Sequence, residues 1–166
     1  DLTVMGKVIG GGLPAAAYGG PREHMERIAP AGDVYQAGTL SGNPLAVAAG
    51  LATLEQLDAA AYKRLEELTA RLADGFAELA ADRPLQVASA PGLVTLFFSP
   101  VPVVDFATAT ACDVGAQARF CRALLERGVY PPPAQYEAWF VSLAHDEAAI
   151  EQTLAAAREA LDEVLD

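Results

Sequence analysis

The chain has 166 residues, of which 52% are hydrophobic, and it carries 11 Lys and Arg against 22 Asp and Glu, a formal net charge of −11. This apolar fraction excludes a wholly disordered chain, because disorder needs low hydrophobicity together with high net charge. The acidic balance argues against a nucleic-acid-binding surface and against docking on an anionic membrane, because both need clusters of Lys and Arg. No apolar run reaches the roughly 18 residues that a membrane-spanning helix needs.

Two cysteines, Cys112 and Cys121, are too few for a disulfide framework. They lie nine residues apart without a neighbouring Cys or His, which argues against a zinc site. We expect buried, reduced thiols, as free cysteines usually are. Reduced thiols and an N-terminus without a secretory pattern predict a cytoplasmic protein without a metal.

Glycine and proline are concentrated in residues 1–44. Such a stretch predicts short strands and tight turns in which the backbone lies close to other groups. Short strand pieces are expected at residues 8–9 and 17–18. Pro21 suits the first turn of a short helix, which we expect to run to about residue 29.

From Asn43 the pattern becomes helical. Asn43 can cap a helix whose first position suits Pro44. Later apolar residues recur at three- and four-residue steps, with charged residues mainly off the apolar stripe, and this spacing predicts amphipathic helices. Helices are therefore expected over residues 45–57, 60–81, 113–127 and 146–165.

Between these helices lie runs rich in β-branched and aromatic residues. They predict strands over residues 85–87, 93–98 and 139–143, with Pro91-Gly92 as the turn between the first two. The chain is expected to be α/β, and its second part a small α+β domain. We expect residues 1–58 to belong to one domain and residues 59–166 to another.

Lys7 is the only lysine in the first sixty residues, and its neighbours are apolar residues and glycines. Burial disfavours the charged form of an amine. A neutral amine is the nucleophile that forms Schiff bases with carbonyls, including pyridoxal phosphate. The alternative is a lysine whose stem lies on apolar surface with its ammonium in water. The glycines around Lys7 do not fit a Walker phosphate loop, because Val8 stands where Ser or Thr is needed for magnesium.

Two other segments carry polar groups in distinctive surroundings. Residues 36–44 offer backbone N–H groups, hydroxyls and a helix start, which suits either a phosphate site or a simple helix cap. Glu137 follows three prolines and lies between aromatic residues. These neighbours favour a raised pKa or pairing with a buried cation, and the alternative is a carboxylate paired with a surface Arg. We expect His145 to cap or pack, and His24 to lie at the surface.

At these three segments the sequence resembles the C-terminal portion of the glutamate-1-semialdehyde 2,1-aminomutases, a family of class III pyridoxal-phosphate aminotransferases. The matching strings are GKVIGGGLP (residues 6–14), YQAGTLSGNPLAVAAGLATLE (35–55) and GVYPPPAQYEAWFVSLAH (128–145). The first two are shared in looser form across class III, and the third is more selective. Ala134, Tyr136, Trp139 and the Leu93-Val94 pair depart from the residues usual in that family.

The resemblance implies the C-terminal part of a fold type I pyridoxal-phosphate transferase, with residues 1–58 as the end of its large domain. It implies that Lys7 forms the Schiff base with the cofactor. It implies that Gly38 and Thr39 reach the cofactor phosphate across the interface of a homodimer. Glu137 matches a position on the substrate side.

The activity implied is a pyridoxal-phosphate-dependent isomerisation of (S)-4-amino-5-oxopentanoate to 5-aminolevulinate in tetrapyrrole (porphyrin) synthesis, with the cofactor starting in its pyridoxamine form. The alternative is another class III aminotransferase acting on an ω-amino acid. A different class of interpretation is a non-catalytic domain that serves dimerisation. In the family, the Asp at the pyridine nitrogen and the Arg for the substrate carboxylate precede the lysine. We therefore expect these 166 residues to be inactive by themselves.

Overall fold

The computed structural model describes residues 1–165. They form two compact units, the first being Asp1–Ala59 and the second beginning at Ala60. Both combine helices and strands, as the predicted α/β class requires. Among the described residues, no helix combines the length and the apolar character needed to cross a membrane.

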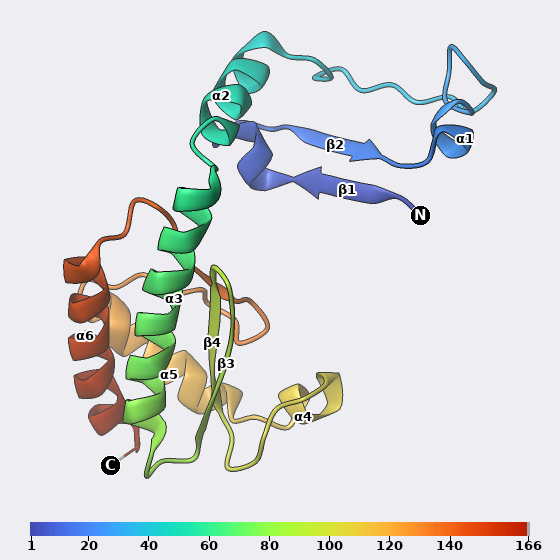
Figure 1. Cartoon of the computed structure of the whole chain (residues 1–166). Coiled ribbons are helices and arrows are strands. Elements are labelled where there is room, and N and C mark those ends of the chain that lie inside the picture. The colour runs from blue at the N-terminus through green and yellow to red at the C-terminus, as the bar shows by residue number, and fades with distance from the viewer. Residues whose placement is uncertain (166) are drawn as a thin grey trace. The chain divides into compact units, whose positions relative to one another are not determined.

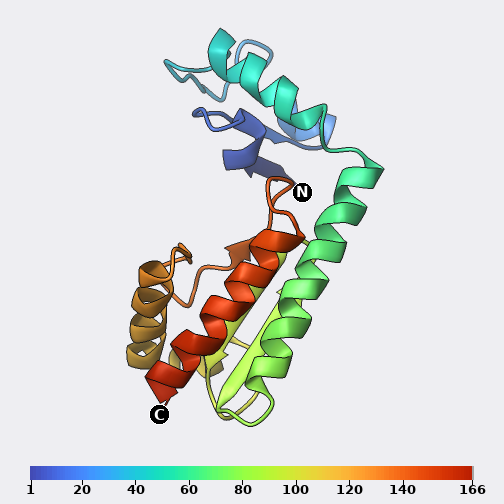
Figure 2. The same cartoon turned by 90° about the vertical axis from the view of Figure 1, so that its left-hand side faces the viewer.

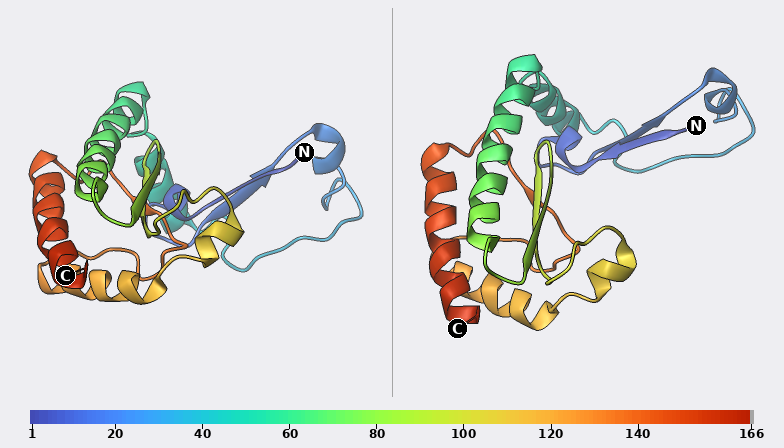
Figure 3. Two further views of the ribbon diagram at one scale, coloured as in Figure 1. Left: turned by 90° about the horizontal axis from the view of Figure 1, so that it is seen from below. Right: turned by 60° about the horizontal axis from the view of Figure 1, so that its bottom comes forward.

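The first unit is built on a two-stranded ribbon. β1 (Thr3–Gly6) pairs antiparallel with β2 (Ala16–Gly19), so that Gly6 lies opposite Ala16. The 3-10 helix η1 (Lys7–Gly10) follows β1 directly. The ribbon extends from η1 toward the short helix α1 (Arg22–Met25), and an irregular segment then leads to α2 (Pro44–Leu54) (Figures 1 and 3).

Two predictions for this unit are wrong. Residues 8–9 lie in η1 rather than in a strand, because the chain turns back at Gly11, which has a positive φ of 57°. The helix expected to reach residue 29 ends at Met25. The following backbone groups pair across a turn instead, the N–H of Ala29 donating to the carbonyl of Val34 and that of Val34 to the carbonyl of Arg27. The strand at residues 17–18 is confirmed as part of β2.

Helix α2 begins as the sequence predicts. The side-chain oxygen of Asn43 accepts hydrogen bonds from the N–H groups of Leu45 and Ala46 at 3.0 and 3.1 Å, and Pro44 occupies the first helical position. Such a cap satisfies N–H groups that have no partner inside the helix.

Helix α2 then packs backbone to backbone on η1. A Cβ at Gly50 would lie 2.3 Å from the carbonyl oxygen of Ile9, and one at Gly11 would lie 2.4 Å from that of Ala49. Glycine is required at both positions because any side chain would push the two elements apart.

The second unit is a three-stranded antiparallel sheet covered by helices. Its strand order is β3 (Leu85–Ala90), β4 (Leu93–Phe98) and β5 (Trp139–Phe140). Gly92, with a φ of 81°, makes the tight turn between β3 and β4 possible. β5 is shorter than the expected 139–143, because its partner β4 begins at Leu93, opposite Phe140, and the pairing runs out at the turn, where the Val141 N–H donates to the Gly92 carbonyl.

Three long helices belong to this unit: α3 (Ala59–Ala80), α5 (Val114–Glu126) and α6 (Glu147–Leu165). They confirm the predicted helices, and α6 lies between α3 and α5 (Figure 2). The largest fully buried side chains come from these helices and from β4: Phe76, Phe120, Leu68, Leu96, Leu124, Leu161 and Val94. Phe76 also meets Trp139 edge to face, with ring centroids 5.2 Å apart, which ties β5 to α3.

Ion pairs line the two sides of α6. Arg64 on α3 donates to Glu147 at 2.8 Å, and Arg71 and Arg83 pair with Glu151 and Asp162. On the other side, Arg127 bonds both Glu159 and Glu163, at 3.2 and 2.8 Å. In each of these pairs α6 supplies the carboxylate.

Both cysteines are free and buried, as predicted. Burial raises the pKa of the Cys112 and Cys121 thiols, because a desolvated thiolate is disfavoured. The thiols therefore behave as packing groups rather than as nucleophiles.

Candidate functional site

Lys7 occupies an unusual backbone position. It is the first residue of η1, and among residues 1–165 it is the only non-glycine residue with a positive φ, at 53°. A side chain in this conformation is strained, and such residues cluster at functional sites. Three elements hold the Lys7 backbone there: β1 precedes it, β2 pairs with β1, and α2 packs on the rest of η1.

The Lys7 side chain itself is exposed, and its amine has no hydrogen-bond or ion-pair partner within residues 1–165. The sequence left two interpretations of this amine open, one shielded from water and one with its ammonium in water. The first unit does not supply that shield, because the residues that follow Lys7 turn away toward α2.

Gly38 and Thr39 lie in a run of turns that leads into α2. The Ser41 N–H donates to the Gly38 carbonyl at 3.0 Å, and the Asn43 N–H donates to the Leu40 carbonyl at 3.1 Å. Thr39 is exposed, and its hydroxyl has no partner in the described part of the chain. A free hydroxyl and free N–H groups before a helix start form a suitable cradle for an anion.

The structure does not bring Thr39 to Lys7. η1 packs on the Ala49–Thr53 part of α2, whereas Thr39 precedes the opposite, N-terminal end of that helix. Within one copy of the chain, the amine and the anion cradle are therefore separated along α2.

Glu137 belongs to the second unit. Its N–H donates to the Ala134 carbonyl at 3.0 Å, closing a turn over residues 134–137. The carboxylate is exposed and, within residues 1–165, has neither a buried cation nor an Arg partner. The carboxylate is therefore unpaired in the described part of the chain, and its expected place on the substrate side stays a prediction.

Sequence reasoning missed the residues that hold this turn. Gln135 is only 3% exposed, and its Nε2 donates to the Ala109 carbonyl at 2.7 Å. Ala109 lies in α4 (Phe106–Thr110), a short helix that was not predicted although Asp105 and Thr108 form a capping box at its start. The Thr108 N–H holds the pKa of the Asp105 carboxyl below its usual range, because it bonds the charged form. This box was a readable sequence signal, whereas nothing in the sequence marks Gln135.

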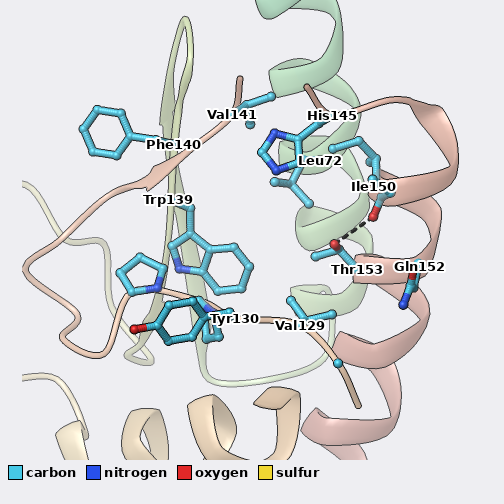
Figure 4. Close-up of a pocket in the computed structure, with 14 residues that line it drawn as sticks. Leu72, Val129, Tyr130, Trp139, Phe140, Val141, His145, Ile150, Gln152 and Thr153 are labelled. Atoms are coloured by element: carbon cyan, nitrogen blue, oxygen red, sulfur yellow. Dashed lines mark hydrogen bonds between the residues drawn. The ribbon is translucent and has the colours of Figure 1, made fainter. Parts of the chain in front are cut away.

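A cavity of about 360 Å³ lies elsewhere in the second unit. Figure 4 shows its apolar lining, which includes Leu72, Trp139 and Ile150, with His145 at its edge. His145 Nδ1 accepts from the Ser142 N–H at 3.0 Å, a local role in the turn before α6 that agrees with the predicted capping or packing. Neither Lys7, Thr39 nor Glu137 lines this cavity.

The predicted groups fit one kind of ligand. Lys7 offers a free amine, which suits an aldehyde, and residues 38–41 offer donors, which suit a phosphate, so two copies of the chain could serve a ligand that carries both groups. Among residues 1–165, no cluster of three or more His, Cys, Asp or Glu side chains could hold a metal ion.

Comparison with known proteins gives a consistent result. The family model described as aminotransferase class-III matches residues 1–158. Glutamate-1-semialdehyde 2,1-aminomutase of Roseiflexus castenholzii is 57% identical over 164 residues, and that of Thermomicrobium roseum is 54% identical over 167 residues. These matches cover 97% and 99% of this chain, but the chain spans only 38% and 39% of those relatives.

Two solved structures are similar over the whole chain. An omega-transaminase from Sphaerobacter thermophilus has a TM-score of 0.87 at 29% identity, covering 100% of this chain and 39% of that one. A glutamate-1-semialdehyde-aminomutase from Pseudomonas aeruginosa, in complex with PMP, has a TM-score of 0.85 at 25% identity, covering 99% of this chain and 39% of that one.

Proposed function

Because this chain belongs to the class-III aminotransferase family, we propose that it supplies part of the site of a pyridoxal-phosphate enzyme that converts (S)-4-amino-5-oxopentanoate to 5-aminolevulinate, a step of tetrapyrrole synthesis. The relatives at 52–57% identity that carry the aminomutase name support this reaction. The proposal rests on the position of Lys7, whose unpaired amine is carried by a strained turn that β1, β2 and α2 hold in place. Residues like those in the unmatched part of the longer relatives complete the site.

Lys7 has two tasks in this proposal. Its amine would hold the cofactor when the cofactor is in its aldehyde form. When the cofactor carries the amino group instead, Nζ would be free, and it would take a proton from one carbon of the reacting system and return it to another. A general base and acid of this kind needs its neutral form at the working pH, which a water-excluding cover favours. Pyridoxal phosphate, when bound, supplies an electron-withdrawing ring that stabilises the charge left by the removed proton.

Gly38 and Thr39 hold the cofactor phosphate of a second copy. The exposed Thr39 hydroxyl, before the end of α2 that is remote from η1, supports sharing across a homodimer interface. The same interface supplies the cover that Lys7 lacks in one chain. We place this homodimer in the cytoplasm, consistent with its two free thiols.

The two units take different parts in this proposal. The first, Asp1–Ala59, is the end of the large cofactor-binding domain, and the second is the small C-terminal domain. The exposed Glu137 carboxylate is the small domain's contribution on the substrate side.

The test is Lys7→Ala in a full-length protein, meaning a polypeptide that contains these 166 residues and matches the length of the relatives. The variant should lose the visible absorbance of the bound cofactor together with aminomutase activity. Lys63→Ala is the matched control, because Lys63 is the only other lysine of the chain and lies exposed on α3. Absorbance that survives in Lys7→Ala would show that the cofactor is attached elsewhere.

The second candidate is a transaminase for an ω-amino acid, favoured by the structural similarity to the Sphaerobacter omega-transaminase. Product analysis of the full-length protein separates the two reactions. An aminomutase forms 5-aminolevulinate without an external amino acceptor, whereas a transaminase turns over only when a keto acid is supplied.

A further inference from the structure

Gln135 is a buried polar residue whose hydrogen bonding is incomplete. Its Nε2 donates to the Ala109 carbonyl at 2.7 Å, but its Oε1 is buried and finds no partner among the described residues. A buried acceptor without a partner lowers stability, because water could have bonded it in the unfolded chain. An apolar side chain of similar length would remove this cost, and the Ala109 carbonyl would lose Gln135 but keep the Cys112 N–H as a donor at 3.3 Å. Stability alone therefore does not explain a glutamine here.

The hydrogen bond of Gln135 joins two segments that are distant in sequence. The glutamine is the second residue of the turn over residues 134–137, whose last residue is Glu137. Its partner Ala109 belongs to α4, whose start is fixed by the Asp105–Thr108 capping box. The bond therefore connects the turn that follows the three prolines to the short helix α4.

A second contact acts in the same direction. The ring of Tyr136 lies against that of Phe106, with centroids 6.1 Å apart and planes inclined by 38°. Both rings are largely exposed, so this contact alone gives weak support. Within the turn over residues 134–137, Gln135 alone has a buried side chain that forms a hydrogen bond to a group outside the turn.

We propose that Gln135 is a positioning residue that anchors the turn over residues 134–137 to α4 and thereby sets the place of the Glu137 carboxylate on the substrate side. The substrate-side part rests on the proposed function, whereas the anchoring rests on this structure alone. Loss of the anchor leaves Glu137 chemically intact but lets it occupy many positions. Substrate binding then suffers before the chemical step does.

The variant that tests this is Gln135→Met, which keeps the length of the side chain and removes both the donor and the orphaned oxygen. Gln117→Met is the matched control. Gln117 is equally buried at 3% exposure and also has an orphaned Oε1, but it donates within its own helix, to Cys121. Exchange of the Glu137 amide hydrogen with solvent reports on the turn, because this N–H is bonded to Ala134.

In the 166-residue chain, Gln135→Met should speed Glu137 amide exchange about tenfold, the effect of losing one hydrogen bond, while the urea midpoint stays equal or rises. Gln117→Met should leave the Glu137 exchange rate unchanged. In the full-length protein, Gln135→Met should raise KM for the amino-aldehyde about tenfold with kcat little changed and the cofactor absorbance intact.

Unchanged exchange in Gln135→Met, or equal acceleration in Gln117→Met, overturns the anchoring. A fall in kcat at constant KM overturns the substrate-side role. A wild-type full-length protein that lacks aminomutase activity overturns the proposed function and that role with it, and the exchange rates then decide the anchoring separately.

Discussion

The backbone contact between η1 and α2 leads to a prediction whose sign is opposite to that of helix propensity. Replacing Gly50, in the middle of α2, by Ala would ordinarily stabilise a helix by about 1 kcal/mol. Here the added Cβ would lie 2.3 Å from the carbonyl oxygen of Ile9. We therefore expect Gly50→Ala to destabilise the contact between α2 and the turn that carries Lys7.

The magnitude follows from that distance. Real Cβ atoms essentially never come within 3.0 Å of such an atom, so the oxygen must retreat by at least 0.7 Å. The oxygen belongs to the backbone and cannot swing aside, so η1 or α2 must move as a whole. Overpacking of this kind costs about 1–3 kcal/mol. After subtraction of the propensity gain, the net loss reaches about 2 kcal/mol.

Hydrogen exchange of the α2 amides in the 166-residue chain measures this loss. Exchange should become faster, by up to about thirtyfold for 2 kcal/mol. Ala48→Gly, at an exposed position of the same helix, calibrates the effect of propensity alone. If Gly50→Ala slows exchange instead, the close approach does not constrain this helix and the reasoning about the Lys7 turn is wrong.

Two further predictions concern the second unit. Phe76→Ala should lower its free energy of unfolding by about 3–5 kcal/mol, because Phe76 is fully buried against Trp139. Urea denaturation followed by circular dichroism measures this, with Phe106→Ala, 76% exposed, as a control that should change it by less than about 0.5 kcal/mol. The hydrogen bond from Arg64 lowers the pKa of the Glu147 carboxyl from 4.5 to about 2, so its stabilisation is complete above pH 4.5 and is lost as the pH falls toward 2. The difference in thermal midpoint between wild type and Glu147→Gln should therefore shrink over that range, and a constant difference would contradict the pairing.

The sequence predicted the long helices well because each contains several turns of apolar spacing, as in α3 and α6. It failed where a few residues decide the structure by contact. Residues 8–9 are apolar enough for a strand, but the approach of α2 to Gly11 forces the chain into a turn. The end of β5 after Phe140 likewise depends on where its partner strand β4 begins, at Leu93, which is distant in sequence.

For the site, residue type and neighbours were sufficient to single out Lys7 and the run around Thr39. They could not show that Lys7 is exposed in its own unit, since exposure depends on how the following turn packs. Nor could they indicate Gln135, because its partner is a backbone carbonyl, and every residue has one.

The charges around α6 have a consequence for how the second unit assembles. Arg64 and Arg71 of α3, and Arg83 just after its end, meet carboxylates that follow one another in the same order along α6, so the two helices run parallel in one defined alignment. A slide of one helical turn would bring acidic residues of α6 toward acidic residues of α3 such as Glu67 and Asp74, and like charges repel. These bridges lie at the surface and contribute little to stability. Their effect is to disfavour misaligned packing of the two helices.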